Sequence, residues 1–196
     1  MAALPKRELA RELGRRYPKV AWERYHDTLE MIEGVVYRSP FPDEDAREIR
    51  RVKARVERER IPPGEDAEFH LKLGPGALTD VEFTVQLLQL QHGFEHPGVR
   101  TPSTALALRR LAEASVLDAD DAATLAEAYE FCERARNARY LVTGKPGDSL
   151  PIGAAAARIG LLLGFVHRPE TLVRDEFRRV TRRARRVVDR VFYEWT

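Results

Sequence analysis

Apolar side chains recur every three to four residues along most of the chain, a spacing typical of amphipathic helices. In the segment that starts at Lys19 they are Trp22, Tyr25, Leu29, Ile32 and Val36, which fall on one helix face. A second helix is predicted to begin at Asp43, after the turn 39–42, and it carries few apolar residues among many charges of both signs. We interpret this second helix as a solvated face with ion pairs between residues four apart.

The longest apolar repeat lies near the end of the chain, in a helix that Pro169 opens. Its members alternate between spacings of four and three: Val173, Phe177, Val180, Ala184, Val187 and Val191. Such near-heptad spacing favours packing along a helical bundle. Other helices are predicted to start at Thr101 with Pro102 and at Asp118, the latter ending at Gly144, and a helix of small residues covers about 152–163.

The helical period is lost between Ile61 and Leu78, where six residues are Pro or Gly. Inside this stretch, residues 69–72 alternate apolar and polar side chains, which predicts a short extended segment. The whole pattern predicts an all-α fold, an antiparallel helical bundle of about five to seven helices with one long irregular loop. We assign residues 1–16 to an N-terminal extension that forms a short helix, and residues 17–196 to the bundle domain.

The end of the irregular loop carries a constellation with possible chemistry. Lys72, Gly74 and Gly76 place a cation and two permissive backbone positions just before a helix N-terminus, where backbone amides suit a phosphate group. Thr79 and Glu82 have the spacing of a capping box, in which each side chain satisfies the other residue's backbone amide. The helix is therefore predicted to start at this point.

A purely structural interpretation of the same residues stays open. In it the glycines only form turns, and Asp80 stabilises the positive end of the helix dipole. Glu82, Gln86 and Gln89 follow one another at helical spacing and form a polar stripe, which usually faces water. The residues alone do not decide between a ligand site and a structural loop.

Composition and charge exclude several classes of protein. Hydrophobic residues make up 43% and charged residues 33% of the 196 residues, a balance typical of a globular protein. The formal net charge of +2 gives no overall excess of positive charge for nucleic acid, and no apolar run is long enough to cross a bilayer. We therefore expect no nucleic-acid partner and no membrane association.

The thiol and imidazole groups indicate no reactive site. Cys132 is the single cysteine and lies on the apolar face of its helix, so we expect a buried thiol and no internal disulfide. His92 and His96 have no nearby third ligand, so no metal site is predicted. The common nucleotide-binding and hydrolase motifs are missing, so we assign no catalytic residue. The start of the chain lacks a secretory segment, which makes a cytoplasmic location the expectation.

The last helix bears the concentrated basic surface of the chain. Between residues 169 and 194, eight arginines stand against five acidic residues, a local net charge of +3. The arginines, which we place on the outside of the helix, are Arg174, Arg178, Arg179, Arg182, Arg183, Arg185, Arg186 and Arg190. Arg182, Arg183 and Arg186 are candidates for docking a partner protein by charge complementarity.

Several runs of the sequence resemble one known family. The most specific run extends from Leu71 to Gln91 (LKLGPGALTDVEFTVQLLQLQ), and it is preceded by residues 50–57 (RRVKARVE). Similarity continues through residues 98–101, 117–121, 178–185 and 190–193, and so covers about 17–193. These runs are similar to the bifunctional glutamine synthetase adenylyltransferase and adenylyl-removing enzyme, particularly its actinobacterial form. The similar region is the C-terminal helical domain of that enzyme.

The resemblance implies a helical domain that follows a nucleotidyltransferase domain and packs against its active site. That catalytic domain carries an Asp-x-Asp pair that holds two magnesium ions, and this sequence has no such arrangement. The chain is therefore expected to be non-catalytic by itself, with no cofactor of its own and with ATP and Mg²⁺ bound in the full enzyme. The full reaction transfers an adenylyl group from ATP to a tyrosine of glutamine synthetase and removes it by phosphorolysis.

The resemblance also assigns residues and partners. Six positions match the family's motif and are the candidates for lining the active-site cleft: Lys72, Gly74, Gly76, Asp80, Glu82 and Gln86. At Ala77 the family usually has a glycine. The implied partners are glutamine synthetase, the nucleotidyltransferase domain and a PII-type signal protein. The alternative function is a non-catalytic interaction module that docks glutamine synthetase or the PII-type protein through its arginine-rich last helix.

Overall fold

The computed structural model describes residues 19–59, 61 and 65–193, and for residues 19–26 the backbone alone. These residues form seven α-helices: α2 (Lys19–Val36), α3 (Asp43–Glu59), α4 (Leu78–His92), α5 (Thr104–Glu113), α6 (Ala119–Thr143), α7 (Gly153–Leu162) and α8 (Pro169–Val191). Two short 3-10 helices cover Ala67–Phe69 and Pro97–Val99. The prediction of an all-α helical bundle is confirmed. The helix predicted within residues 1–16 lies outside the described residues.

The chain divides into two compact units, Met1–Pro40 and Phe41–Thr196. The first unit contains α2, whose bounds agree with the helix predicted from Lys19 to Val36. Two residues of its predicted apolar face, Ile32 and Val36, are 47% and 41% exposed. The predicted domain boundary after residue 16 lies outside the described part of the chain and stays a prediction.

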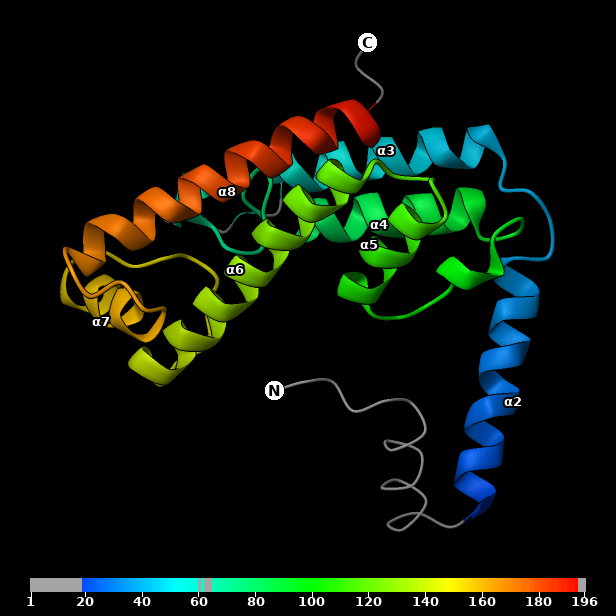
Figure 1. Cartoon of the computed structure of the whole chain (residues 1–196), viewed down its shortest axis with the longest axis horizontal. Helices are drawn as coiled ribbons and strands as arrows, with labels where there is room; N and C mark the ends of the chain where they lie inside the picture. Colours follow the sequence, from blue (N-terminus) through cyan, green and yellow to red (C-terminus); the bar gives the residue numbers. More distant parts are fainter. Residues whose placement is uncertain (1–18, 60, 62–64, 194–196) are drawn as a thin grey trace. The chain divides into compact units, whose positions relative to one another are not determined.

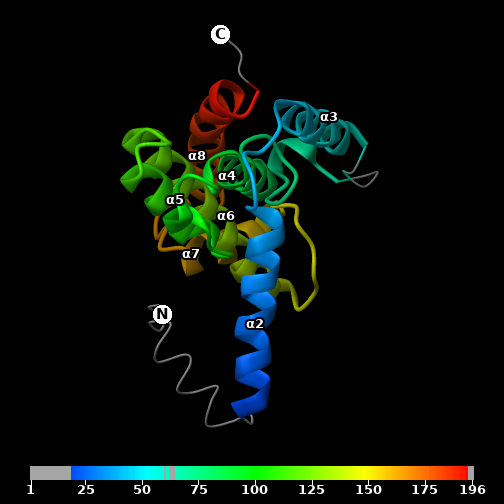
Figure 2. The same ribbon diagram turned by 90° about the vertical axis from the view of Figure 1, so that its right-hand side faces the viewer.

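The second unit is built around α8. Figures 1 and 2 show this helix running from α7 at its N-terminal end to α3 at its C-terminal end, with α6 packed alongside. Its predicted apolar repeat is confirmed, because five of the six members are buried: Val173, Phe177, Val180, Ala184 and Val187. Burying each of the larger side chains among them contributes about 1.5–3 kcal/mol to folding.

Buried apolar side chains form two clusters that share α6 and α8. The first cluster joins α4 and α5 to the N-terminal part of α6 and the C-terminal part of α8, around residues such as Leu111 and Val188. The second joins the irregular loop and α7 to the other halves of these two helices, around Phe69 and Phe177. The rings of Phe69 and Phe177 stack with centroids 5.6 Å apart. Helix α8 therefore holds both halves of the unit together.

Several helix ends agree with the sequence. Asp118 caps α6 by accepting hydrogen bonds from the amides of Asp120 and Asp121, and Gly144 ends that helix with a φ of 64°. The predicted start of α5 at Pro102 is wrong, because Ser103 is the capping residue and accepts a hydrogen bond from the Leu106 amide. A serine hydroxyl in this position satisfies an amide at the helix start, which proline at the first helical position does not do.

The irregular loop before α4 is confirmed as a stretch without an α-helix in its described residues, but its details differ from the prediction. Phe69 ends a 3-10 helix instead of belonging to an extended segment, and His70 alone pairs with Ser149 in an isolated bridge. The predicted capping box is wrong. Helix α4 begins at Leu78, and the Thr79 hydroxyl is buried with no hydrogen-bond partner. Thr79 already lies inside the helix, so its side chain does not cap it.

Across the described residues, no helix is both long enough and apolar enough to span a bilayer.

Candidate functional site

A set of buried and half-buried polar side chains joins α3, α4 and α8 in the second unit. The Lys53 ammonium contacts the Asp80 carboxylate and lies 2.7 Å from Oε1 of Glu57. Nη1 of Arg185 lies 2.9 Å from the same Glu57 oxygen and 3.0 Å from Oδ2 of Asp80. The Tyr193 hydroxyl donates to Glu57 at 2.9 Å. We call Lys53, Glu57, Asp80, Arg185 and Tyr193 the ionic cluster.

The ionic cluster overturns two predictions about charged helix faces. Lys53 is 1% exposed, so the interpretation of α3 as a solvated face is wrong at this position. It lies four residues after Ile49 and three before Val56, on the apolar side of the helix. Arg185 faces inward and not outward, since it lies four residues after buried Thr181. Each cation is tolerated inside because carboxylates neutralise it.

The protonation states of the ionic cluster follow from its geometry. Burial pushes the pKa of Glu57 up, but hydrogen bonds from Lys53 and Arg185 outweigh it and leave the pKa below its ordinary value. Burial and the hydrogen bond to Glu57 raise the pKa of Tyr193, so its phenol stays protonated and donates. At neutral pH Glu57 is therefore charged and Tyr193 is neutral. Their arrangement is that of a structural clamp.

The glycines of the loop allow a close approach to α8. A Cβ atom added to Gly76, whose φ is 73°, would lie 2.0 Å from the Thr181 carbonyl oxygen. A Cβ atom on Gly74 would lie 2.5 Å from the His70 carbonyl oxygen. Both glycines are thus required by packing within the protein. The structure brings them next to Asp80, which accepts a hydrogen bond from the Gly76 amide at 2.7 Å.

Backbone amides of the loop donate within the protein. The amides of Gly74 and Ala77 donate to His70 and Gly74 carbonyls at 2.9 and 3.0 Å. The amides of Leu78 and Thr79, at the helix start, donate back to the loop at 3.3 and 2.9 Å. A phosphate cradle needs amides that point at the ligand. Hydrogen bonds within the protein therefore explain the conformation of the loop. A ligand role for Gly74, Gly76 and Asp80 stays a prediction.

The other three candidates lie away from the ionic cluster. Lys72 and Gln86 are exposed and Glu82 is half-buried. Burial raises the pKa of Glu82. The charges of Lys72, Glu133 and Arg136 also act on this carboxyl, which places the latter two, from α6, on the same side of α4. Asp80 lies two residues before Glu82, on the opposite side of the helix.

We call Lys72, Glu82, Gln86, Glu133 and Arg136 the polar face. Sequence reasoning missed its two α6 members. Their spacing of three residues on a long helix, four and seven residues after Tyr129, was the available signal. The polar face combines the exposed Lys72, Gln86 and Glu133 with the half-buried Glu82 and with Arg136, whose Nε lies 2.5 Å from Oδ1 of Asp148. Its exposed members can contact a polar partner without unfolding any packing.

The arginines of α8 are mostly engaged with acidic residues. Glu127 accepts from both Arg179 and Arg183, the latter at 3.0 Å. Arg190 pairs with Asp121, and Arg178 lies 2.9 Å from Glu68. Of the three docking candidates, Arg183 is thus already paired. Arg182 is 71% exposed and lies only within 3.9 Å of Glu68, and Arg186 is exposed without an ion pair to any described residue.

The thiol and metal predictions have separate outcomes. Cys132 is buried, as predicted, and burial raises its pKa to about 12, so the thiol is not a nucleophile at neutral pH. Over the described ranges, no group of three or more His, Cys, Asp or Glu side chains has the arrangement to hold a metal ion. The donor set of these described residues therefore does not fit Mg²⁺.

Comparison with known sequences decides the family. A profile of the family described as "GlnD PII-uridylyltransferase" matches residues 46–195. The chain belongs to this family. The match begins three residues inside α3, at Ala46, and covers α4 to α8 completely, so it includes both the ionic cluster and the polar face.

Relatives in actinobacteria share the name "Bifunctional glutamine synthetase adenylyltransferase/adenylyl-removing enzyme". The protein of Streptomyces avermitilis is 48% identical over 167 residues, which are 84% of this chain and 17% of the relative. That of Streptomyces coelicolor is 45% identical over 184 residues, 93% of this chain and 17% of the relative. That of Leifsonia xyli subsp. xyli is 42% identical over 164 residues, 83% of this chain and 16% of the relative.

These matches confirm the resemblance that the motifs indicate. The chain corresponds to a region of glutamine synthetase adenylyltransferases and spans about 17% of the length of the relatives it matches.

Proposed function

We propose that the chain is a substrate-positioning and regulatory helical domain of a glutamine synthetase adenylyltransferase, without catalysis of its own. The observation that carries this proposal is the 48% identity over 84% of this chain, set against coverage of 17% of the relative. In the complete enzyme, a nucleotidyltransferase domain would bind ATP and Mg²⁺ and transfer the adenylyl group to a tyrosine of glutamine synthetase. The same enzyme would remove the group by phosphorolysis.

The names of the similar proteins support a positioning role. The family is named for uridylyl transfer and for PII, whereas the relatives are named for adenylyl transfer and for glutamine synthetase. Both names describe the transfer of a nucleotidyl group, but they differ in the group that is transferred and in the protein that is named with it. A helical domain common to both is consistent with holding domains and substrates in place, which is a large source of rate enhancement by itself.

Within this proposal, the polar face is the side that meets the active-site cleft. Lys72, Glu82 and Gln86 lie at or near the surface, and Glu133 and Arg136 extend the same face onto α6. Exposed cations can contact phosphate oxygens, and an amide can orient a hydroxyl acceptor. The ionic cluster would keep α3, α4 and α8 in register behind this face.

The test is an adenylylation assay in the longer protein that contains this domain, with glutamine synthetase as acceptor. We expect Lys72→Ala and Gln86→Ala each to lower kcat/KM about tenfold, a loss of about 1.4 kcal/mol of transition-state stabilisation. The matched control is Lys145→Ala, an exposed lysine in the α6–α7 connection, which should keep the wild-type rate. Wild-type rates in all three variants, with unchanged melting curves, would contradict the role of the polar face.

A second candidate function is docking of an acidic protein surface, on glutamine synthetase or a PII-type signal protein, by α8. The observation that favours it is the exposure of Arg182 and Arg186, which lie four residues apart on one helix face. Arg182→Glu with Arg186→Glu should slow association several-fold at low salt, and added salt should remove the difference. Arg158→Glu on α7 is the control. An association rate that changes neither with charge reversal nor with added salt would exclude this function.

A further inference from the structure

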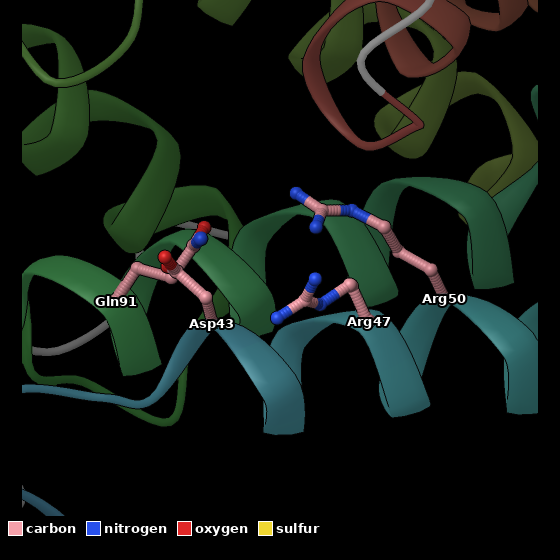
Figure 3. A pocket seen from close by; sticks show the side chains of 4 residues that line it. All are labelled: Asp43, Arg47, Arg50 and Gln91. Atoms are coloured by element: carbon pink, nitrogen blue, oxygen red, sulfur yellow. The ribbon is translucent and has the colours of Figure 1, made fainter.

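A pocket between α3 and α4 lies outside the polar face and away from the outward arginines of α8. It has a volume of about 280 Å³ and is lined by Asp43, Arg47, Arg50 and Gln91 (Figure 3). The three α3 residues are four and three positions apart, so they share one face of that helix. Gln91 comes from the last turn of α4. Neither the family's motif nor the proposed function assigns these residues a role.

The two arginines present their guanidinium groups to the same space. Figure 3 shows both side chains rising from α3 on the side of the pocket. Nε of Arg50 donates to the Phe192 carbonyl oxygen at 2.5 Å, which fixes the orientation of that guanidinium. A group that is already oriented loses less conformational entropy when it binds a ligand.

Of the two pocket arginines, Arg47 is the one without a polar partner among the described residues. It is exposed and makes no ion pair or hydrogen bond with another residue in the described part of the chain. Charged residues of the same helix do pair, as in Arg51 with Glu48 at 3.3 Å and Lys53 with Glu57 at 2.7 Å. Asp43, one turn before Arg47, forms no such bridge with it, and it lines the same pocket as Gln91 (Figure 3).

We infer that this pocket binds the phosphate group of a small molecule. The fork of Arg47 can donate two parallel hydrogen bonds to an oxyanion, and the Arg50 guanidinium, three residues further along the helix, adds positive charge at the same end of the pocket. The amide of Gln91 adds a donor. The Asp43 carboxylate repels any second anionic group of the ligand at its end of the pocket. The ligand therefore carries its negative charge at the arginine end.

The test is a titration of the full chain with inorganic phosphate at constant ionic strength, followed by the NMR signals of the arginine Nε–H groups. We expect saturable shifts at Arg47 and Arg50. Arg47→Gln should raise Kd about tenfold or more, whereas Asp43→Asn should lower it. The matched control is Arg55→Gln. Arg55 is an exposed arginine of the same helix, eight residues and about 12 Å further along its axis, and Kd should change less than about twofold.

Three outcomes would overturn the inference. The first is an equal loss in the Arg47 and Arg55 variants, which would reveal attraction to the general charge of α3. The second is a titration without saturation. The third is acetate binding as tightly as phosphate, which would assign the pocket to carboxylates. Because Arg47 is exposed and makes no hydrogen bond or ion pair with a described residue, its variant should fold, and a melting curve matching the wild type verifies this.

Discussion

Lys53 carries its charge into the interior, where its ammonium lies between the carboxylates of Glu57 and Asp80. Oε1 of Glu57 in turn accepts hydrogen bonds from Lys53, Arg185 and Tyr193. Removing one member of such a set leaves an uncompensated buried charge and costs about 3–5 kcal/mol. Asp80→Ala is therefore expected to destabilise the fold, and it cannot serve as a clean test of a role in catalysis.

The lowered pKa of Glu57 makes the stability of the protein depend on pH. A carboxyl with a lowered pKa stabilises the fold fully above its ordinary pKa of 4.5, and this contribution is lost as the pH falls through the lower, folded-state pKa. We expect Glu57→Gln to reduce the free energy of unfolding at pH 7 and to matter progressively less below about pH 4. Urea denaturation of both proteins at a series of pH values measures this difference. A difference that stays constant down to acid pH would refute the assigned role.

At the scale of elements, the sequence predicted the helices well and the connections poorly. Periodicity located α8 and the α6 ends because apolar spacing, the Asp118 cap and Gly144 act locally. The capping box and the start of α5 failed because several residues compete for each helix end and packing selects among them. Lys53 and Arg185 were missed as a pair because they are far apart in sequence, so no local pattern joins them. For the same reason the sequence named Lys72, Glu82 and Gln86 as candidates and did not join Glu133 and Arg136 of α6 to them.

The contact between the irregular loop and α8 gives a test at this scale. Gly76→Ala places a methyl group against the Thr181 carbonyl and forces alanine to adopt a positive φ. We expect a loss of about 2 kcal/mol or more, because α8 cannot retreat without opening both apolar clusters. The matched control is Gly98→Ala, where nothing lies within 4 Å of the added atom. Equal melting temperatures of the two variants would show that the loop does not seat on α8 in this way.

At the scale of the second unit, α8 contributes side chains to both apolar clusters. The two clusters are therefore expected to unfold together. Val188 lies in the first cluster and Cys132 in the second. The two clusters also share α6, so opening one end of the unit exposes apolar surface at the other. Such sharing favours a single cooperative transition.

Labelling of the buried Cys132 thiol measures this cooperativity. Val188→Ala removes buried apolar volume worth about 1.5–3 kcal/mol. If the unit opens as a whole, Cys132 should react about tenfold faster or more with a thiol reagent under native conditions, since each 1.4 kcal/mol is about tenfold. Val166→Ala, at a 73% exposed side chain, is the control and should leave the rate unchanged. Unchanged labelling in Val188→Ala would mean that the clusters open independently.

The ionic cluster also limits how the sequence can change over evolutionary time. Each charged member of the ionic cluster, at positions 53, 57, 80 and 185, is neutralised by another member. A single substitution therefore leaves a charge without its partner, whereas joint replacement by apolar residues of similar volume can leave the stability nearly unchanged. Changes at neighbouring positions of this kind are strongly non-additive. Among relatives, these four positions should therefore covary, either all kept as charges or all exchanged together.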